Sequence, residues 1–70
     1  YKQDNAPLAI REFRRSIVKN PQNPSYHYHL GLAYLKVGQK EPAKQSLQEA
    51  LRLNPDFPEA SDAKSRLNTL

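Results

Sequence analysis

The chain contains two histidines, His27 and His29, and these imidazole groups are the first candidates for metal or acid–base chemistry. A step of two residues along a helix turns by about 200°, so the two rings point to opposite sides and cannot share a metal ion. We expect His27 to be a packed, half-buried ring and His29 to be a surface residue. The absence of cysteine excludes zinc ribbons, redox CxxC sites and thiol nucleophiles.

The remaining polar residues do not form the patterns that catalysis needs. No serine is matched by a histidine base and an acidic orienting group. Gly31 and Gly38 are the only glycines, which excludes a glycine-rich phosphate loop. We therefore expect no catalytic, cofactor-binding or metal-binding residue, and a protein that is not an enzyme.

Length and composition limit the fold that carries these side chains. A chain of 70 residues with a net charge of +4 forms one small domain, which buries only about 60% of its unfolded surface and cannot build a deep cleft alone. No apolar run reaches the roughly 18 residues that span a bilayer, so we expect no membrane insertion. The chain opens on Tyr1 rather than Met, and we expect it to be a piece of a longer protein.

The sequence repeats with a period of 34 residues. Residue types recur at this spacing in the pairs Lys2 and Lys36, Ala9 and Ala43, Asn20-Pro21 and Asn54-Pro55, and Pro24 and Pro58. A period of this length is one helix-turn-helix unit, which cannot bury its apolar face alone and needs neighbouring units stacked on it.

Proline divides the chain into helices. The prolines that suit a first helical turn are Pro7, Pro24, Pro42 and Pro58, and those that follow helix ends are Pro21 and Pro55. The pattern predicts helices over 7–19, 24–37, 41–53 and 58–69, preceded by the end of a truncated helix at 1–3, and Asn23 is a good N-cap. No segment alternates with a period of two, so we expect an all-α fold without strands.

The helices differ in their apolar faces. Helix 41–53 carries one apolar stripe through Ala43, Leu47 and Leu51, and its opposite face is polar. Apolar residues wrap most of helix 24–37, which predicts neighbours on both sides. Gly31 lies in the middle of this helix, where glycine costs about 1 kcal/mol relative to alanine. We attribute it to the close approach of another helix.

Residues 24–57 resemble one whole tetratricopeptide repeat. The residues that carry the resemblance are Leu30-Gly31-x-Ala33-Tyr34, Gly38, Ala43, Leu47, Ala50, Leu51 and Asn54-Pro55. Residues 1–23 are similar to the last two-thirds of a preceding, truncated repeat, and residues 58–70 look like a C-terminal capping helix. The resemblance implies antiparallel helix pairs stacked as a short right-handed α-solenoid, which acts as a non-catalytic scaffold for protein–protein interaction.

The resemblance also implies a peptide-binding concave wall built from the first helix of each repeat. Carried over to this sequence, the wall consists of Ser25, Tyr28, Leu32, Leu35 and Lys36, flanked by Glu59, Asp62 and Arg66. Tyr28, Leu32 and Leu35 form an apolar row that is a candidate groove for a protein or peptide segment. In the alternative interpretation, these three residues pack against the last helix or a preceding N-terminal helix.

A basic stripe on helix 7–19 supports an alternative function. Its members recur at helical spacing and would bind nucleic acid or an acidic partner: Arg11, Arg14, Arg15 and Lys19. Glu12 interrupts the stripe, and no aromatic residue stands among the arginines to stack on a base. We therefore favour a protein partner over nucleic acid.

The truncated repeat suggests a further contact. The predicted stump at 1–3 leaves part of the apolar surface of helix 7–19 without a covering helix, namely at Leu8, Ala9, Ile10 and Phe13. Self-association through this surface would relieve the exposure.

Overall fold

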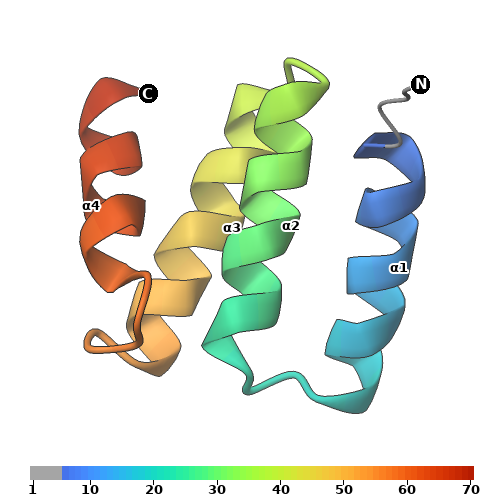
Figure 1. Ribbon diagram of the computed structural model, residues 1–70, viewed down its shortest axis with the longest axis horizontal. Coiled ribbons are helices and arrows are strands. Elements are labelled where there is room, and N and C mark those ends of the chain that lie inside the picture. Colours follow the sequence, from blue (N-terminus) through green and yellow to red (C-terminus); the bar gives the residue numbers. More distant parts are fainter. Residues whose placement is uncertain (1–5) are drawn as a thin grey trace.

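The computed structural model describes residues 6–70, and these form four helices in which each runs antiparallel to the one before (Figure 1). The helices are α1 (Ala6–Lys19), α2 (Pro24–Lys36), α3 (Lys40–Leu53) and α4 (Ala60–Thr69). No strand occurs in this part of the chain. The predicted all-α helical-repeat fold is therefore confirmed, whereas the predicted stump at 1–3 lies outside the described residues.

The caps explain where the helices begin. Asn23 caps α2 as predicted: its Oδ1 accepts hydrogen bonds from the backbone N–H groups of Ser25 at 3.0 Å and Tyr26 at 3.4 Å. The prediction that a helix starts at Pro58 is wrong, because α4 begins at Ala60. The preceding turn instead carries the Phe57 ring into the core, where it is 3% exposed.

The hairpin of α2 and α3 is tightly packed around Gly31. A Cβ atom on Gly31 would lie 3.0 Å from Cγ and Cδ2 of the fully buried Leu47, and 3.2 Å from the carbonyl oxygen of Ala43. The close approach of a helix at Gly31 is thus confirmed. In the turn that follows α2, Gly38 has φ 79°, which only glycine adopts without strain.

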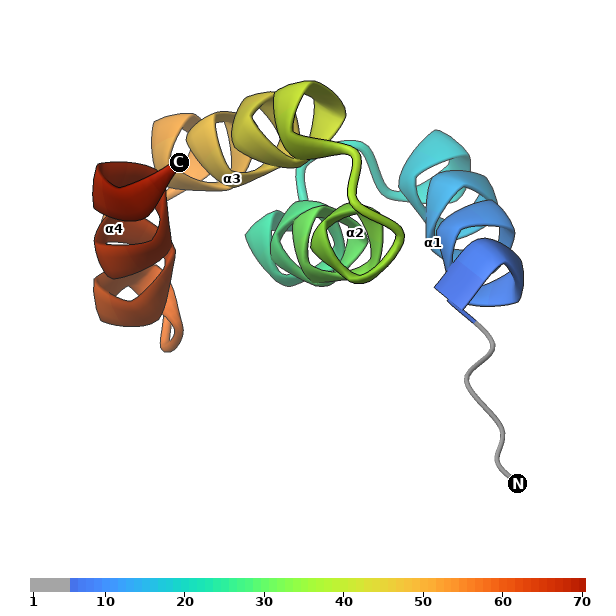
Figure 2. The same cartoon turned by 90° about the horizontal axis from the view of Figure 1, so that it is seen from above.

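The remaining core joins α4 to this hairpin. The cluster consists of Tyr28, Leu47, Ala50, Phe57, Ala60 and Ala63, with Leu32, Leu51, Leu67 and Leu70 packed against it. The alanines let α4 approach α3 closely, because the distance between two packed helices decreases with the size of the side chains at their contact. Seen from above, α2 lies between α1 and α4, which explains why its apolar residues wrap around it (Figure 2).

Helix α1 is the least buried of the four. Ala6 is its one buried residue. The helix contacts α2 through the stacked rings of Phe13 and His29, whose centroids lie 5.5 Å apart. The face of α1 that carries Ala9, Ser16 and Ile17 is partly buried.

Candidate interaction surface

The predicted concave wall lies on α2 and α4, two helices on the same side of α3 (Figure 2). Its α2 members recur at spacings that keep them on one helical face: Ser25, Tyr28, Leu32, Leu35 and Lys36. Leu32 and Leu35 are partly buried, as is Ser25, whereas Lys36 is exposed. On α4, Asp62 and Arg66 are exposed.

Tyr28 is a core residue rather than an exposed member of this wall. It is 6% exposed, and its ring makes edge contacts with Phe57 at 5.8 Å and His29 at 5.2 Å between centroids. The expectation that Tyr28 forms part of an open apolar row is therefore wrong, and the alternative of packing toward the last helix holds for this residue. Leu32 also packs against the core cluster but keeps part of its surface exposed.

The hydroxyl of Tyr28 connects the two helices of the wall. It donates a hydrogen bond to Oδ2 of Asp62, and Nε of Arg66 donates to the same oxygen at 2.7 Å. Tyr28 and Asp62 are separated by 34 residues, so they occupy equivalent positions in successive repeats. The arrangement ties Asp62 and Arg66 of α4 to Tyr28 of α2.

The electrostatics of this group follow from the hydrogen bonds. The hydroxyl of Tyr28, followed by the guanidinium of Arg66, lowers the pKa of Asp62. Burial, followed by the hydrogen bond to Asp62, raises the pKa of Tyr28. Near neutral pH the group therefore contains a neutral phenol and an ion pair. Nearby, the carboxylate oxygen Oε1 of Glu59 is buried and has no hydrogen-bond partner among the described residues.

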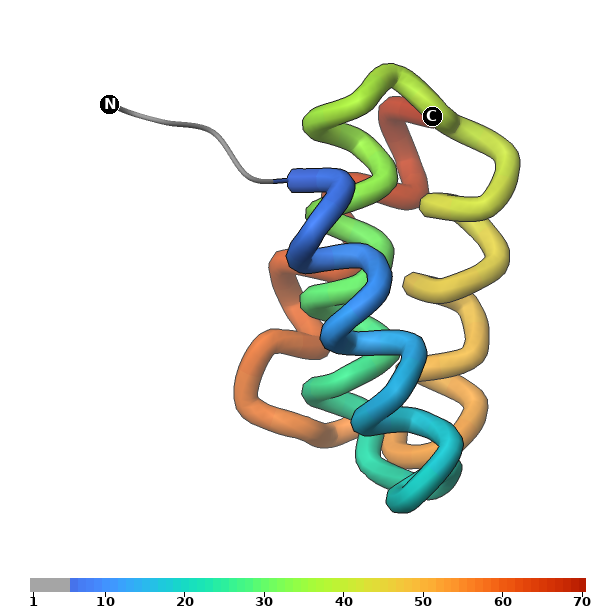
Figure 3. Tube along the Cα trace, turned by 90° about the vertical axis from the view of Figure 1, so that its right-hand side faces the viewer, coloured from blue at the N-terminus to red at the C-terminus, as the bar shows by residue number. Residues whose placement is uncertain are grey.

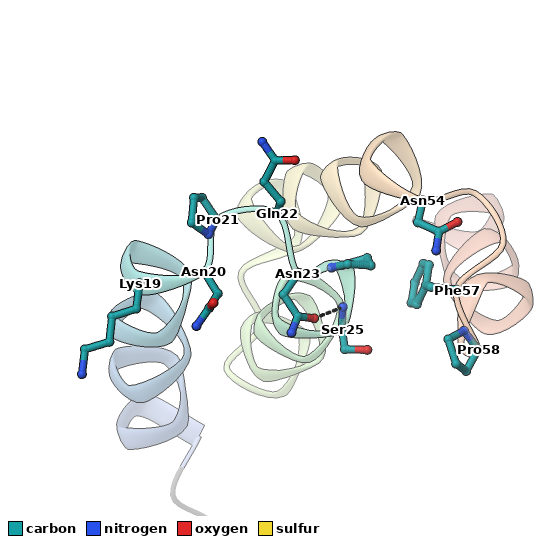
Figure 4. Close-up of a pocket in the computed structure, with 10 residues that line it drawn as sticks. Lys19, Asn20, Pro21, Gln22, Asn23, Ser25, Asn54, Phe57 and Pro58 are labelled. Carbon is teal, nitrogen blue, oxygen red and sulfur yellow. Dashed lines mark hydrogen bonds between the residues drawn. The ribbon is translucent and has the colours of Figure 1, made fainter.

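A polar pocket of about 610 Å³ lies at one end of the helices, beside this wall (Figure 4). It is lined by residues of the α1–α2 and α3–α4 connections and the start of α2, namely Lys19, Asn20, Pro21, Gln22, Asn23, Pro24, Ser25, Asn54, Phe57 and Pro58. This pocket was not among the predicted sites. The recurrence of Asn20-Pro21 as Asn54-Pro55 would have indicated it, because turns one period apart meet at the same end of a stack.

The histidines take different roles from each other. His27 is partly buried, as predicted, and its Nε2 lies 3.0 Å from the carbonyl oxygen of Pro21. The prediction that His29 is a surface residue is wrong, because its ring packs between Phe13 and Tyr28. Within residues 6–70, no three His, Asp or Glu side chains gather closely enough to hold a metal ion. In the same range, no helix is both long and apolar enough to cross a membrane.

The predicted basic stripe is exposed along α1, at Arg11, Arg14, Arg15 and Lys19. Two hollows border it. One of about 500 Å³ is lined by Pro7, Ile10, Arg11, Arg14, Arg15 and Val18, and one of about 220 Å³ is lined by Glu12, Arg15, Ser16 and Lys19. Basic and apolar side chains are thus mixed on this helix.

Stacked antiparallel helix pairs with a 34-residue period define an α-helical repeat protein, and comparison with known families gives the particular class. The tetratricopeptide repeat model matches residues 24–57, and a second TPR repeat model matches residues 1–38. The chain belongs to the tetratricopeptide repeat family. Repeats of this family generally mediate protein–protein interaction and are typically non-catalytic.

One curated relative extends this comparison. The chain is 27% identical over 62 residues to the general transcriptional corepressor ssn6 of Schizosaccharomyces pombe (strain 972 / ATCC 24843). The match covers 86% of this chain and 6% of that protein, so the chain spans a small part of the relative's length. No solved structure gives a significant match.

Proposed function

We propose that the chain is a protein-interaction module that binds a peptide segment of a partner protein on the wall formed by α2 and α4. The observation that carries this proposal is that Leu32 and Leu35 stay partly exposed on α2, while the hydrogen bond from Tyr28 to Asp62 joins this helix to the Asp62–Arg66 ion pair of α4. An apolar strip beside fixed charges gives both binding energy and orientation, which is the usual composition of a peptide groove.

Each wall residue has a role in this proposal. Leu32 and Leu35 contact apolar side chains of the peptide, and Ser25 offers a hydroxyl to its backbone. The paired Asp62 and Arg66 offer fixed polar groups that orient the peptide, and Lys36 lies at the exposed end of the α2 row. Tyr28 is a positioning residue, since its hydroxyl holds Asp62 while its ring stays in the core.

Peptides selected from a random display library on the 70-residue chain test this proposal. We expect Leu35→Ala and Arg66→Gln to weaken binding of the selected peptides by about tenfold each, because the first removes an apolar contact and the second a charged group of the wall. Leu8→Ala on α1 and Arg52→Gln on α3 are matched controls. Arg52 is a close match for Arg66, since it also pairs with a carboxylate on its own helix, that of Glu49.

The pattern of losses decides the outcome. Binding that falls only in the two wall variants supports the proposal. Selected peptides that bind all four variants equally well would overturn it, as would losses confined to the controls. Circular dichroism of each variant verifies that the helices persist.

A further inference from the structure

The outward face of α1 departs from the repeat to which it belongs. Ile10 and Val18 stand one period before Lys44 and Arg52 of α3, so apolar residues replace charged ones at equivalent positions. Val18 is 81% exposed, the highest value among the large hydrophobic residues that the structure leaves in solvent. An apolar side chain gains nothing from such a position in the isolated molecule.

Packing between repeats does not account for these residues. Helix α3 contacts both α2 and α4, yet its outward residues Lys44, Gln48 and Arg52 are all exposed. By the same geometry, these positions of α1 would face outward even with a second helix packed on it; in the structure Arg14 and Val18 are exposed, and Ile10 is partly buried. In Figure 3, α1 lies in front of α2 at one end of the described stack.

The charges on this face also differ from those on α3. Arg11, Arg14 and Arg15 of α1 correspond to Gln45, Gln48 and Glu49 of α3. The ion pairs Arg52–Glu49 and Arg66–Asp62 lie on α3 and α4, and within residues 6–70 none of the three α1 arginines takes part in an ion pair. Glu12, the acidic residue of α1, borders the separate hollow with Ser16 and Lys19.

We propose that this face is a second docking surface, separate from the wall on α2 and α4, and that it binds an acidic amphipathic segment of a partner protein. The face consists of Pro7, Ile10, Arg11, Arg14, Arg15 and Val18, which enclose the hollow of about 500 Å³. Apolar side chains of the partner contact Ile10 and Val18. Carboxylates on either side pair with the guanidinium groups, which bind them in a bidentate manner.

The apolar residues of this face favour a protein segment over nucleic acid. A phosphate backbone has no apolar group to place against Ile10 and Val18, and the face has no aromatic ring on which a base could stack. A surface that binds phosphate would bind it more tightly with cations in place of Ile10 and Val18, and α3 carries such cations at the equivalent positions Lys44 and Arg52.

Exchanging residues between the two helices tests the proposal. One variant of the 70-residue chain, Ile10→Lys with Val18→Arg, gives α1 the cations of α3 and removes the apolar side chains of the face. A second variant, Arg11→Gln with Arg14→Gln, gives it the amides of α3 and removes charge. Both introduce residues that the chain already carries at equivalent exposed helical positions, so the fold should persist. Circular dichroism verifies this, and Leu35→Ala on the α2 wall is the control for the other surface.

The probes are a fluorescein-labelled peptide with two leucines two helical turns apart among glutamates, a scrambled peptide of the same composition, and a single-stranded DNA oligonucleotide. We expect the amphipathic peptide to bind the wild type more tightly than the scrambled one does, and both exchange variants to weaken it by about tenfold. Leu35→Ala should leave it unchanged.

The variant Ile10→Lys with Val18→Arg distinguishes an amphipathic protein segment from a partner that binds by charge alone, because it should weaken binding of the first and strengthen binding of the second. A purely electrostatic surface would bind more tightly after Ile10→Lys with Val18→Arg, because the change adds positive charge. Tighter binding of the amphipathic peptide by that variant would overturn the proposal. So would absence of peptide binding by the wild type, or oligonucleotide binding that exceeds peptide binding and falls steeply with salt.

Discussion

At the scale of single residues, Tyr28 shows how one side chain serves both the core and the interaction surface. Its ring is buried among Phe57 and His29, and its hydroxyl reaches Asp62 at the edge of the wall. The ring therefore contributes to the stability of the core, and the hydroxyl contributes to the arrangement of charged groups on the surface. Removing the hydroxyl alone changes the surface, whereas removing the ring opens the core.

We predict that Tyr28→Phe raises the pKa of Asp62 toward its ordinary value, because the Tyr28 hydroxyl is the main cause of its lowering. A carboxyl group whose pKa is lowered by folding stabilises the fold above its unfolded-state pKa, and this contribution is lost as the pH falls through the folded-state pKa. Tyr28→Phe should therefore reduce the loss of stability on acidification. NMR titration of the Asp62 carboxyl carbon measures the shift directly.

Arg66→Gln gives the comparison for this prediction. The guanidinium of Arg66 is the second group that lowers the pKa of Asp62, through its hydrogen bond and its charge, so its removal should also raise this pKa. An Asp62 pKa that is the same in wild type and Tyr28→Phe would contradict the assigned hydrogen bond.

The packing of some of these residues could be predicted from the sequence, and that of others could not. Gly31 was predictable, because a mid-helix glycine is costly unless another helix needs the space. The burial of Tyr28 was not, because two apolar rows on α2 compete for the core and the position of α4 decides between them. The 34-residue spacing of Tyr28 and Asp62 was visible, but their contact depends on how far apart successive repeats sit.

At the scale of helices, the two equivalent positions Asn23 and Phe57 explain why α2 and α4 start differently. Asn23 caps α2 with its side chain, whereas Phe57 enters the core and leaves α4 without a side-chain cap. Proline at the next position therefore begins a helix at Pro24 but not at Pro58. Proline and period alone predict the same start for both helices, and the tertiary role of Phe57 overrides them.

We predict that Phe57→Ala destabilises the chain by about 3–5 kcal/mol, the usual cost of truncating a buried phenylalanine. Asn23→Ala should cost only about 1 kcal/mol, because it removes a cap and no core volume. Urea unfolding followed by circular dichroism gives both values. Amide exchange should rise first within α4 in the Phe57 variant, since Phe57 joins the core cluster next to Ala60 and Ala63. Equal costs for the two substitutions would contradict this account.

At the scale of the whole molecule, burial is uneven along the stack. The core gathers around α2, α3 and α4, whereas α1 contributes Ala6 alone to the buried residues. Leu8 is 46% exposed, and its neighbours Ala9 and Phe13 are only partly buried. The molecule therefore offers apolar surface on α1 in addition to the wall on α2 and α4.

We predict that the 70-residue chain self-associates at high concentration through the side of α1 that carries Leu8, because contact between two copies would bury this exposed side chain. Leu8→Glu should weaken the self-association by about tenfold, since it places a charge in the contact. Sedimentation equilibrium over a range of concentrations measures it. Val18→Arg is the matched control, because Val18 belongs to the outward face and Leu8 does not line the hollow there. A chain that stays monomeric at every concentration would contradict the prediction, and loss of association in Val18→Arg alone would place the contact on the outward face instead.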